Sequence, residues 1–193
     1  MKQLFILFSS FLILCFLSSP LAAQRCLPGM QDVRMIGGSV NGLTGNPDQR
    51  AYFFNLSVDH YTKGANRWVW GIEYFHKNSP YKNTHIPVAQ FTGEGGFYMH
   101  VFSSPSKVFF ASAGVSGLAG YETVNWGKRI LFDGSRIEER ENFIYGTALS
   151  LDLENYLLDN LALFVTIRER LLLNSAINSF HFQWGVGLKY LIR

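Results

Sequence analysis

The sequence predicts an all-β chain that forms an eight-stranded antiparallel up-and-down transmembrane β-barrel after a cleaved signal peptide. Three observations support this expectation: an apolar leader, period-two alternation of apolar and polar residues, and an alternation of short with long connections. The composition agrees, because 16% of the residues are aromatic and 18 are glycine, which favours strands and turns. No later segment has the length of a membrane helix, so the chain would have to cross a bilayer as a closed barrel.

The N-terminal leader has the organisation of a secretory signal peptide. Its single charge is Lys2, an apolar run follows over residues 4–17, and small residues come after that run. We therefore expect residues 1–23 to be removed and residues 24–193 to form one barrel domain. An uncleaved anchor is the weaker alternative, since no basic stop-transfer cluster follows the apolar run. The mature chain would keep only Cys26, so no internal disulfide is expected.

The first four strands are expected at residues 33–40, 51–61, 67–77 and 88–101. The first is inferred mainly from parity, because barrels of this type have an even number of strands. The next three carry large apolar side chains at most alternate positions, which gives each strand one apolar face. These faces consist of Tyr52, Phe54, Leu56 and Val58, of Trp68, Trp70, Ile72 and Tyr74, and of Phe91, Phe97, Met99 and Val101.

The last four strands are expected at residues 108–118, 143–153, 161–171 and 180–192. In the first of these, either the odd-numbered or the even-numbered residues can form the apolar face, and the small residues favour neither strongly. The other three have clear apolar faces, and the final strand is the most regular. These faces consist of Phe143, Tyr145, Leu149, Leu151 and Leu153, of Leu161, Leu163, Val165 and Ile167, and of Phe180, Phe182, Trp184, Val186, Leu188, Tyr190 and Ile192.

The connections between these strands alternate between short and long. Short turns are expected at residues 63–66, 103–106 and 155–160, and longer loops at residues 41–50, 78–86, 119–141 and 174–179. This order is typical of transmembrane barrels, with tight periplasmic turns, longer outer loops and both termini in the periplasm. Alternation alone does not reveal which face is inside, because a soluble lipocalin-like barrel places its apolar side chains inside. Aromatic residues near the strand ends, such as Trp68, Trp184 and Tyr190, favour an apolar face that points outward to a membrane interface.

Several charged residues fall on the opposite, inward face of the strands. An eight-stranded barrel is just wide enough to hold its own side chains, so charges of both signs are expected to pair and fill it. We expect Glu73 or Glu94 to pair with Arg168 or Arg170, and Lys189 to belong to the same network. The sequence therefore predicts a plugged lumen without a conducting pore.

The sequence offers no catalytic, cofactor or metal site. Small outer-membrane barrels include lipid A-modifying enzymes that use serine and histidine. In this chain the histidines lie on different strands and loops with no nucleophile motif beside them. They are His60, His76, His85, His100 and His181. Metal-ligand spacing and a phosphate-binding glycine loop are also missing from the sequence. Because the sequence has no dense basic cluster either, we expect no direct nucleic-acid binding.

The longest expected loop, residues 119–141, mixes aromatic with charged residues. Tyr121, Trp126 and Phe132 are candidates for an outer-loop contact surface. The alternative is an ordered loop that folds over the barrel mouth with an apolar cluster of its own.

The final strand contains a candidate assembly signal. Gln183, Gly185, Leu188 and Tyr190 match the polar, glycine, apolar and aromatic pattern that the outer-membrane assembly machinery reads on a last strand. The chain departs from this pattern because it continues beyond the aromatic residue to Arg193.

Five irregular segments, at residues 24–30, 87–96, 118–127, 168–170 and 185–189, resemble the TraO family of conjugative-transposon proteins from Bacteroidetes. The resemblance covers nearly the whole mature chain. It implies a non-enzymatic outer-membrane component of a conjugative DNA-transfer apparatus, exported by its signal peptide and embedded in outer-membrane lipid. Periplasmic apparatus proteins would meet the short turns, and the long loops would face outside. A lipid-modifying enzyme and a surface adhesin are the alternatives.

Overall fold

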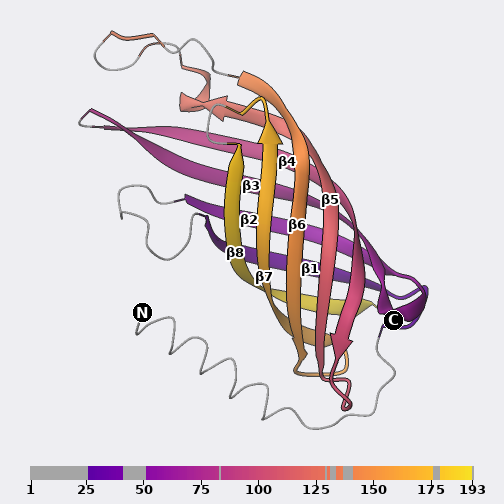
Figure 1. The fold of residues 1–193 in the computed structure, drawn as a ribbon. Coiled ribbons are helices and arrows are strands. Elements are labelled where there is room, and N and C mark those ends of the chain that lie inside the picture. Colours follow the sequence, from indigo (N-terminus) through magenta and orange to yellow (C-terminus); the bar gives the residue numbers. More distant parts are fainter. Residues whose placement is uncertain are drawn as a thin grey trace.

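The chain forms a closed barrel in which each strand pairs with its sequence neighbours and β1 pairs with β8 (Figure 1). The computed structural model describes residues 26–40, 51–82, 84–128, 130, 134–136, 141–175 and 179–192. The expected signal peptide lies outside the described residues. Within the described part of the chain, no helix is long and apolar enough to cross a bilayer.

All eight expected strands are present, and all neighbouring pairs are antiparallel. Their bounds are β1 Gln31–Val40, β2 Ala51–Tyr61, β3 Arg67–Tyr81, β4 Thr84–Ser103, β5 Phe109–Val124, β6 Glu141–Tyr156, β7 Leu161–Leu173 and β8 Phe180–Ile192. The first strand, which the sequence supported mainly by parity, closes the barrel from Gln31 opposite Ile192 to Val40 opposite Gln183. The predicted eight-stranded antiparallel barrel is therefore confirmed.

The barrel is apolar outside, and its interior holds both charged and apolar side chains. Burial alternates without interruption along β2, from buried Ala51 to buried Tyr61, as it must when one face of a strand lines the interior. Large apolar residues such as Phe54, Ile72 and Leu149 are more than 60% exposed, whereas Asp32 and Asp59 are fully buried. In β5 the odd-numbered residues face outward up to Tyr121, which settles the register that the sequence left open.

Two of the expected loops are partly wrong, because strands continue through them. β3 extends to Tyr81 and β4 begins at Thr84, so most of residues 78–86 form a hairpin. Its neighbours stop earlier, since β2 begins at Ala51 opposite Lys77, and the hairpin projects beyond the barrel (Figure 1). Polar and proline residues fit here because the outer edges of this hairpin are unpaired. Its strands therefore need neither a buried apolar face nor a backbone N–H donor at every position.

The second correction concerns the expected loop at residues 119–141. β5 continues to Val124, and a short 3-10 turn, η3 (Asn125–Gly127), follows it. Residues 119–124 therefore belong to the barrel wall. The loop at residues 41–50 lies outside the described residues.

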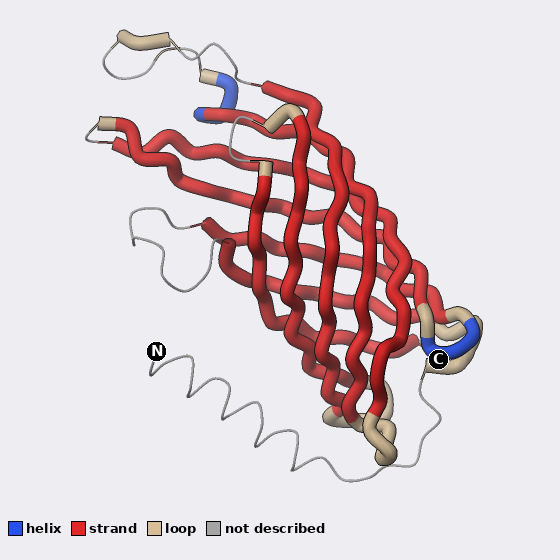
Figure 2. Tube along the Cα trace, viewed as in Figure 1, coloured by secondary structure: helices blue, strands red, loops and turns tan. Residues whose placement is uncertain are grey.

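The two ends of the barrel differ in their connections (Figure 2). At one end lie three short turns, residues 62–66, 104–108 and 157–160, together with the start of β1 and the end of β8. We call this the turn end. The opposite end, where β1 finishes and β2 begins, also carries the β3–β4 hairpin and the β5–β6 connection. We call it the loop end.

Close packing between strands leaves no room for a side chain at one glycine of β5 and leaves room at another. A Cβ atom on Gly120 would lie 2.1 Å from the backbone oxygen of Phe91, whereas one on Gly117 would lie 3.9 Å from that of Gly95. We expect Gly120→Ala to lower the free energy of unfolding by about 1–3 kcal/mol because the clash is with backbone. Gly117→Ala is the matched control and is expected to change it by less than about 0.5 kcal/mol. Urea unfolding in detergent micelles, followed by tryptophan fluorescence, measures both, and equal effects would contradict this packing.

Candidate functional site

The lumen towards the loop end holds four of the five charged residues predicted from the sequence. Arg168 contacts Glu94 at 2.7 Å and Glu73 at 3.2 Å, and Arg170 also forms an ion pair with Glu73. All four side chains are buried. We call this group (Glu73, Glu94, Arg168 and Arg170) the loop-side cluster. Its two carboxylates and two guanidinium groups balance in charge.

Lys189, the fifth predicted residue, lies in a different group. Its Nζ atom is 2.8 Å from Glu154 and 3.2 Å from Asp32, and it also donates to the Tyr61 hydroxyl. Lys189 therefore belongs to a lumenal ion-pair network, but to a different one from that of Glu73, Glu94, Arg168 and Arg170. Alternation assigns a residue to a face of the strand, but strand tilt and register set its depth in the lumen.

A second, larger cluster surrounds Lys189 and was not singled out from the sequence. We call it the turn-side cluster; it consists of Asp32, Arg34, Asp59, Arg67, Asp152, Glu154 and Lys189. Arg67 is its most connected cation, with contacts of 2.8 Å to Asp59, 2.7 Å to Asp152 and 2.9 Å to Glu154. Every member of this cluster lies on the inward face of its strand. Alternation along the strands was therefore the sequence signal that could have identified these residues as lumenal.

Apolar side chains and the two clusters together fill the lumen. At the turn end, Tyr61, Phe110 and Tyr156 pack with Cys26 and Leu191 in a buried group. Between the two clusters, a cavity lined by Arg34, Glu94 and Arg168, among others, has a volume of only about 10 Å³. This volume corresponds to about one water molecule. The arrangement is therefore that of a packed interior.

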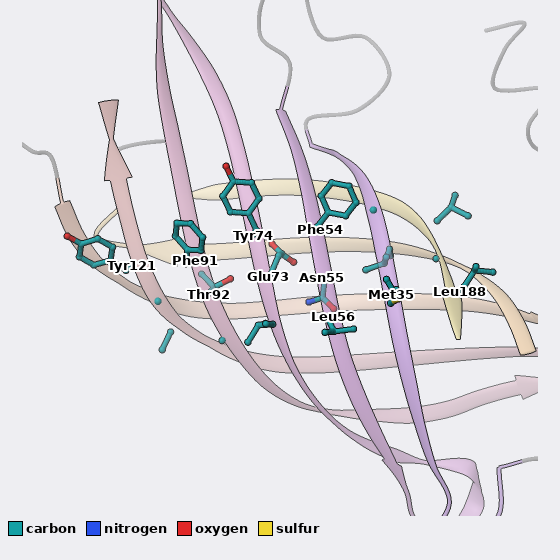
Figure 3. Close-up of a pocket in the computed structure, with 18 of the residues that line it drawn as sticks. Met35, Phe54, Asn55, Leu56, Glu73, Tyr74, Phe91, Thr92, Tyr121 and Leu188 are labelled. Atoms are coloured by element: carbon teal, nitrogen blue, oxygen red, sulfur yellow. The ribbon is translucent and has the colours of Figure 1, made fainter. Parts of the chain in front are cut away.

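The outer face carries an apolar depression of about 1050 Å³ (Figure 3). It lies beside a row of aromatic side chains that are paired across neighbouring strands. The row consists of Phe54, Tyr74, Phe91 and Tyr121. In the next row Gly93 pairs with Ala119, and these small residues leave the space open. Because the outward side chains around it are almost all apolar, the depression provides no arrangement of groups for acid–base chemistry.

The structure describes two of the three candidate loop residues. Tyr121 faces outward from β5, Trp126 is exposed in η3, and Phe132 lies outside the described residues. A hydrogen bond joins the β5–β6 connection to the β3–β4 hairpin, because the Tyr81 hydroxyl donates to Ser135 Oγ at 3.3 Å.

The four candidate assembly residues all lie in β8. Leu188 and Tyr190 face outward and are about half exposed, while Gln183 is buried and donates to Glu73 at 3.1 Å. Gly185 faces the lumen opposite Gly38 of β1. β8 is the last strand of the chain and pairs with both β7 and β1, so it completes the barrel.

The histidines are dispersed over the barrel. His60 and His76 lie on outward positions of β2 and β3, His100 and His181 on inward positions of β4 and β8, and His85 on the exposed hairpin. Across the described residues, no group of three or more His, Cys, Asp or Glu side chains is arranged to hold a metal ion.

Comparison with known families gives one match that covers most of the chain. A family model described as "Conjugative transposon protein TraO" matches residues 27–192. No curated protein matches the chain.

Comparison with solved structures supports the fold. Neisserial surface protein A (NspA) is 7% identical, with a TM-score of 0.57 over 83% of this chain and 95% of that chain. Ail of Yersinia pestis, in complex with sucrose octasulfate, is 10% identical, with a TM-score of 0.56 over 86% of this chain and 100% of that chain. The N-terminal β-barrel domain of Pseudomonas aeruginosa OprF is 8% identical, with a TM-score of 0.50 over 86% and 98%. At these identities the likeness establishes the barrel fold alone and nothing about activity.

Proposed function

Because this chain belongs to the TraO family of conjugative transposon proteins, we propose that it is a non-enzymatic outer-membrane component of a conjugative DNA-transfer apparatus. The single observation that carries the proposal is the family match over residues 27–192. The barrel supports it, because an outward apolar surface with a charged lumen suits a protein surrounded by lipid.

In this proposal the signal peptide at residues 1–23 exports the chain and is removed. Outer-membrane assembly machinery reads β8 through Gln183, Gly185, Leu188 and Tyr190. The turn end then faces the periplasm and its apparatus partners, and the loop end faces outside, as in other barrels with short periplasmic turns. Trp126 and the β3–β4 hairpin offer contact surfaces at the loop end.

A supporting rather than a transporting role follows from the packed lumen. Duplex or single-stranded DNA needs a wide, positively charged path, and this interior holds paired charges of both signs and buried aromatic residues. The dispersed histidines favour a non-enzymatic role over lipid modification. In this proposal DNA crosses the envelope through other proteins, and the barrel holds those proteins in position at the outer membrane.

Deletion of the gene from an intact transposon tests the proposal. We expect the transfer frequency to fall to background and to recover when the gene is supplied in trans. Mass spectrometry of lipid A from the same strains is expected to be unchanged. Transfer that continues at the parental frequency would refute the assignment, and an altered acyl-chain pattern would favour an enzyme.

A further inference from the structure

One carboxylate on the outer face of the barrel has no place in a purely lipid-facing surface. Glu169 lies on β7 between the inward-facing Arg168 and Arg170, and its own position faces outward. Its neighbours two positions away on β7 are Ile167 and Leu171. Across the sheet it is paired with the outward-facing residues Leu149 and Phe182. Directly opposed residues in a sheet have Cβ atoms about 5 Å apart, so the neighbours of Glu169 within the sheet are all apolar.

Among the residues that the structure describes, Glu169 is unusual as a charged residue on the outward face of a strand. No other Asp, Glu, Lys or Arg there faces outward from a strand except Glu141, the first residue of β6. No ion pair or hydrogen bond of the Glu169 side chain occurs within the described chain. Its flanking arginines cannot neutralise it, because Arg168 and Arg170 point into the lumen and pair with Glu73 and Glu94.

The depth of Glu169 separates it from the membrane interface. Leu173, four residues further along β7, is paired with Tyr145, an aromatic residue suited to an interface girdle. Four residues span about 13 Å along a strand, or about 10 Å of depth at a tilt of about 40°. Glu169 therefore lies inside the apolar band, below the level where water or lipid headgroups reach it. A glutamate side chain is too short to snorkel over that distance, unlike Lys or Arg.

We propose that Glu169, with Leu149, Ile167, Leu171 and Phe182, forms a lateral docking face for a membrane-embedded segment of another apparatus protein that carries a lysine or arginine. This inference rests on the proposed function. Ionisable groups inside a bilayer are costly and persist where a partner group compensates them. The partner must bring a lysine or arginine, because the outward faces of the described strands of this chain bear neither. A second copy would therefore set carboxylate against apolar surface or against another carboxylate.

Charge variants in the intact transposon test the docking face. We expect Glu169→Leu, Glu169→Gln and Glu169→Lys each to lower the transfer frequency at least about tenfold, the effect of losing about 1.4 kcal/mol of association. Glu141→Lys is the matched control, an outward glutamate at a strand end, and is expected to leave transfer unchanged. Heat-modifiable migration on gels checks that every variant still folds. Because Glu169→Leu removes a charge from the lipid-facing surface, it is expected to fold at least as well as the parent, so its defect cannot come from misfolding.

Restoration identifies the partner. Selection for transfer in the Glu169→Lys background is expected to yield Lys or Arg replaced by Asp or Glu in a different protein of the same transposon. Restoring changes confined to this chain, or disulfide-linked dimers of a Leu171→Cys variant, would overturn the proposal in favour of a second copy. Greater stability in phosphatidylethanolamine than in phosphatidylcholine vesicles, lost in Glu169→Leu, would overturn it in favour of a lipid amine.

Failure of the docking face can be distinguished from failure of the proposed function. If deletion of the gene abolishes transfer while all three Glu169 variants transfer at the parental frequency, the docking face is wrong and the family role stands. If deletion has no effect, the family role itself fails.

Discussion

Replacing Arg67 with methionine is expected to lower the free energy of unfolding by about 3–5 kcal/mol, the cost of leaving buried charges without their partner. Arg67 is 1% exposed and contacts Asp59, Asp152 and Glu154. Without it, the four carboxylates of the turn-side cluster face only Arg34 and Lys189. The penalty comes from the carboxylates left behind in the lumen, where little water can solvate them.

Urea unfolding of the barrel in phospholipid vesicles measures this loss. Lys63→Met is the matched control, because Lys63 is exposed in the turn between β2 and β3. Its effect is expected to stay within about 0.5 kcal/mol. A loss below about 1 kcal/mol for Arg67→Met would mean that the carboxylates are solvated or neutral, and that the lumen is wetter than the geometry indicates.

Introducing arginine at Leu151 is expected to lower the free energy of unfolding in vesicles by about 2–4 kcal/mol, the cost of a charge on the lipid-facing surface near the bilayer midplane. Leu151 faces outward and is paired with Ile167, at the middle of β7. The same change at Leu158, which is 54% exposed in the turn between β6 and β7, is the control. Leu158→Arg is expected to have an effect below about 0.5 kcal/mol, as for ordinary surface substitutions.

This pair of leucines separates the two environments that an apolar exterior can have. In water, arginine at either exposed leucine would be tolerated, and the two variants would unfold alike. A difference of about 2 kcal/mol or more between them is the signature of lipid around β6. Equal stabilities in vesicles would place the outer face in water and contradict the membrane assignment.

The strands could be predicted from the sequence because a barrel wall separates two different environments. Every second side chain of β2 is exposed, and every second one of β8 is exposed or half-buried, so the alternation of Phe54 with Asn55, or of Trp184 with Gln183, follows directly from the fold. The projecting hairpin was mistaken for a loop because residues 78–81 pair with β4 alone. They lie beyond the barrel, so neither of their faces lines the lumen. Beyond the barrel wall, the pattern that identifies a strand is no longer imposed.

The lumen was only partly predictable for a geometric reason. Alternation correctly placed Glu73 and Lys189 on inward faces, but their depths differ because tilted strands are staggered around the barrel. Asp59 and Asp152 were recognisable as inward residues, yet their shared partner Arg67 lies on a third strand. Glu169 differs from these residues. The alternation of Leu163, Val165 and Ile167 already places it on the outward face, and the register adds that its partners across the sheet are apolar.

The most direct test of the central claim, a lipid-facing barrel with a packed polar lumen, is the accessibility of spin labels on β7. Labels would be attached to cysteines at Leu163, Val165 and Ile167, one at a time, with Cys26 replaced by alanine and Lys128 near the loop end as a water-exposed reference. In lipid vesicles, the three β7 labels are predicted to collide readily with dissolved oxygen and rarely with a water-soluble nickel chelate. Collisions with the chelate as frequent as at Lys128 would show that this face lies in water and would contradict the account.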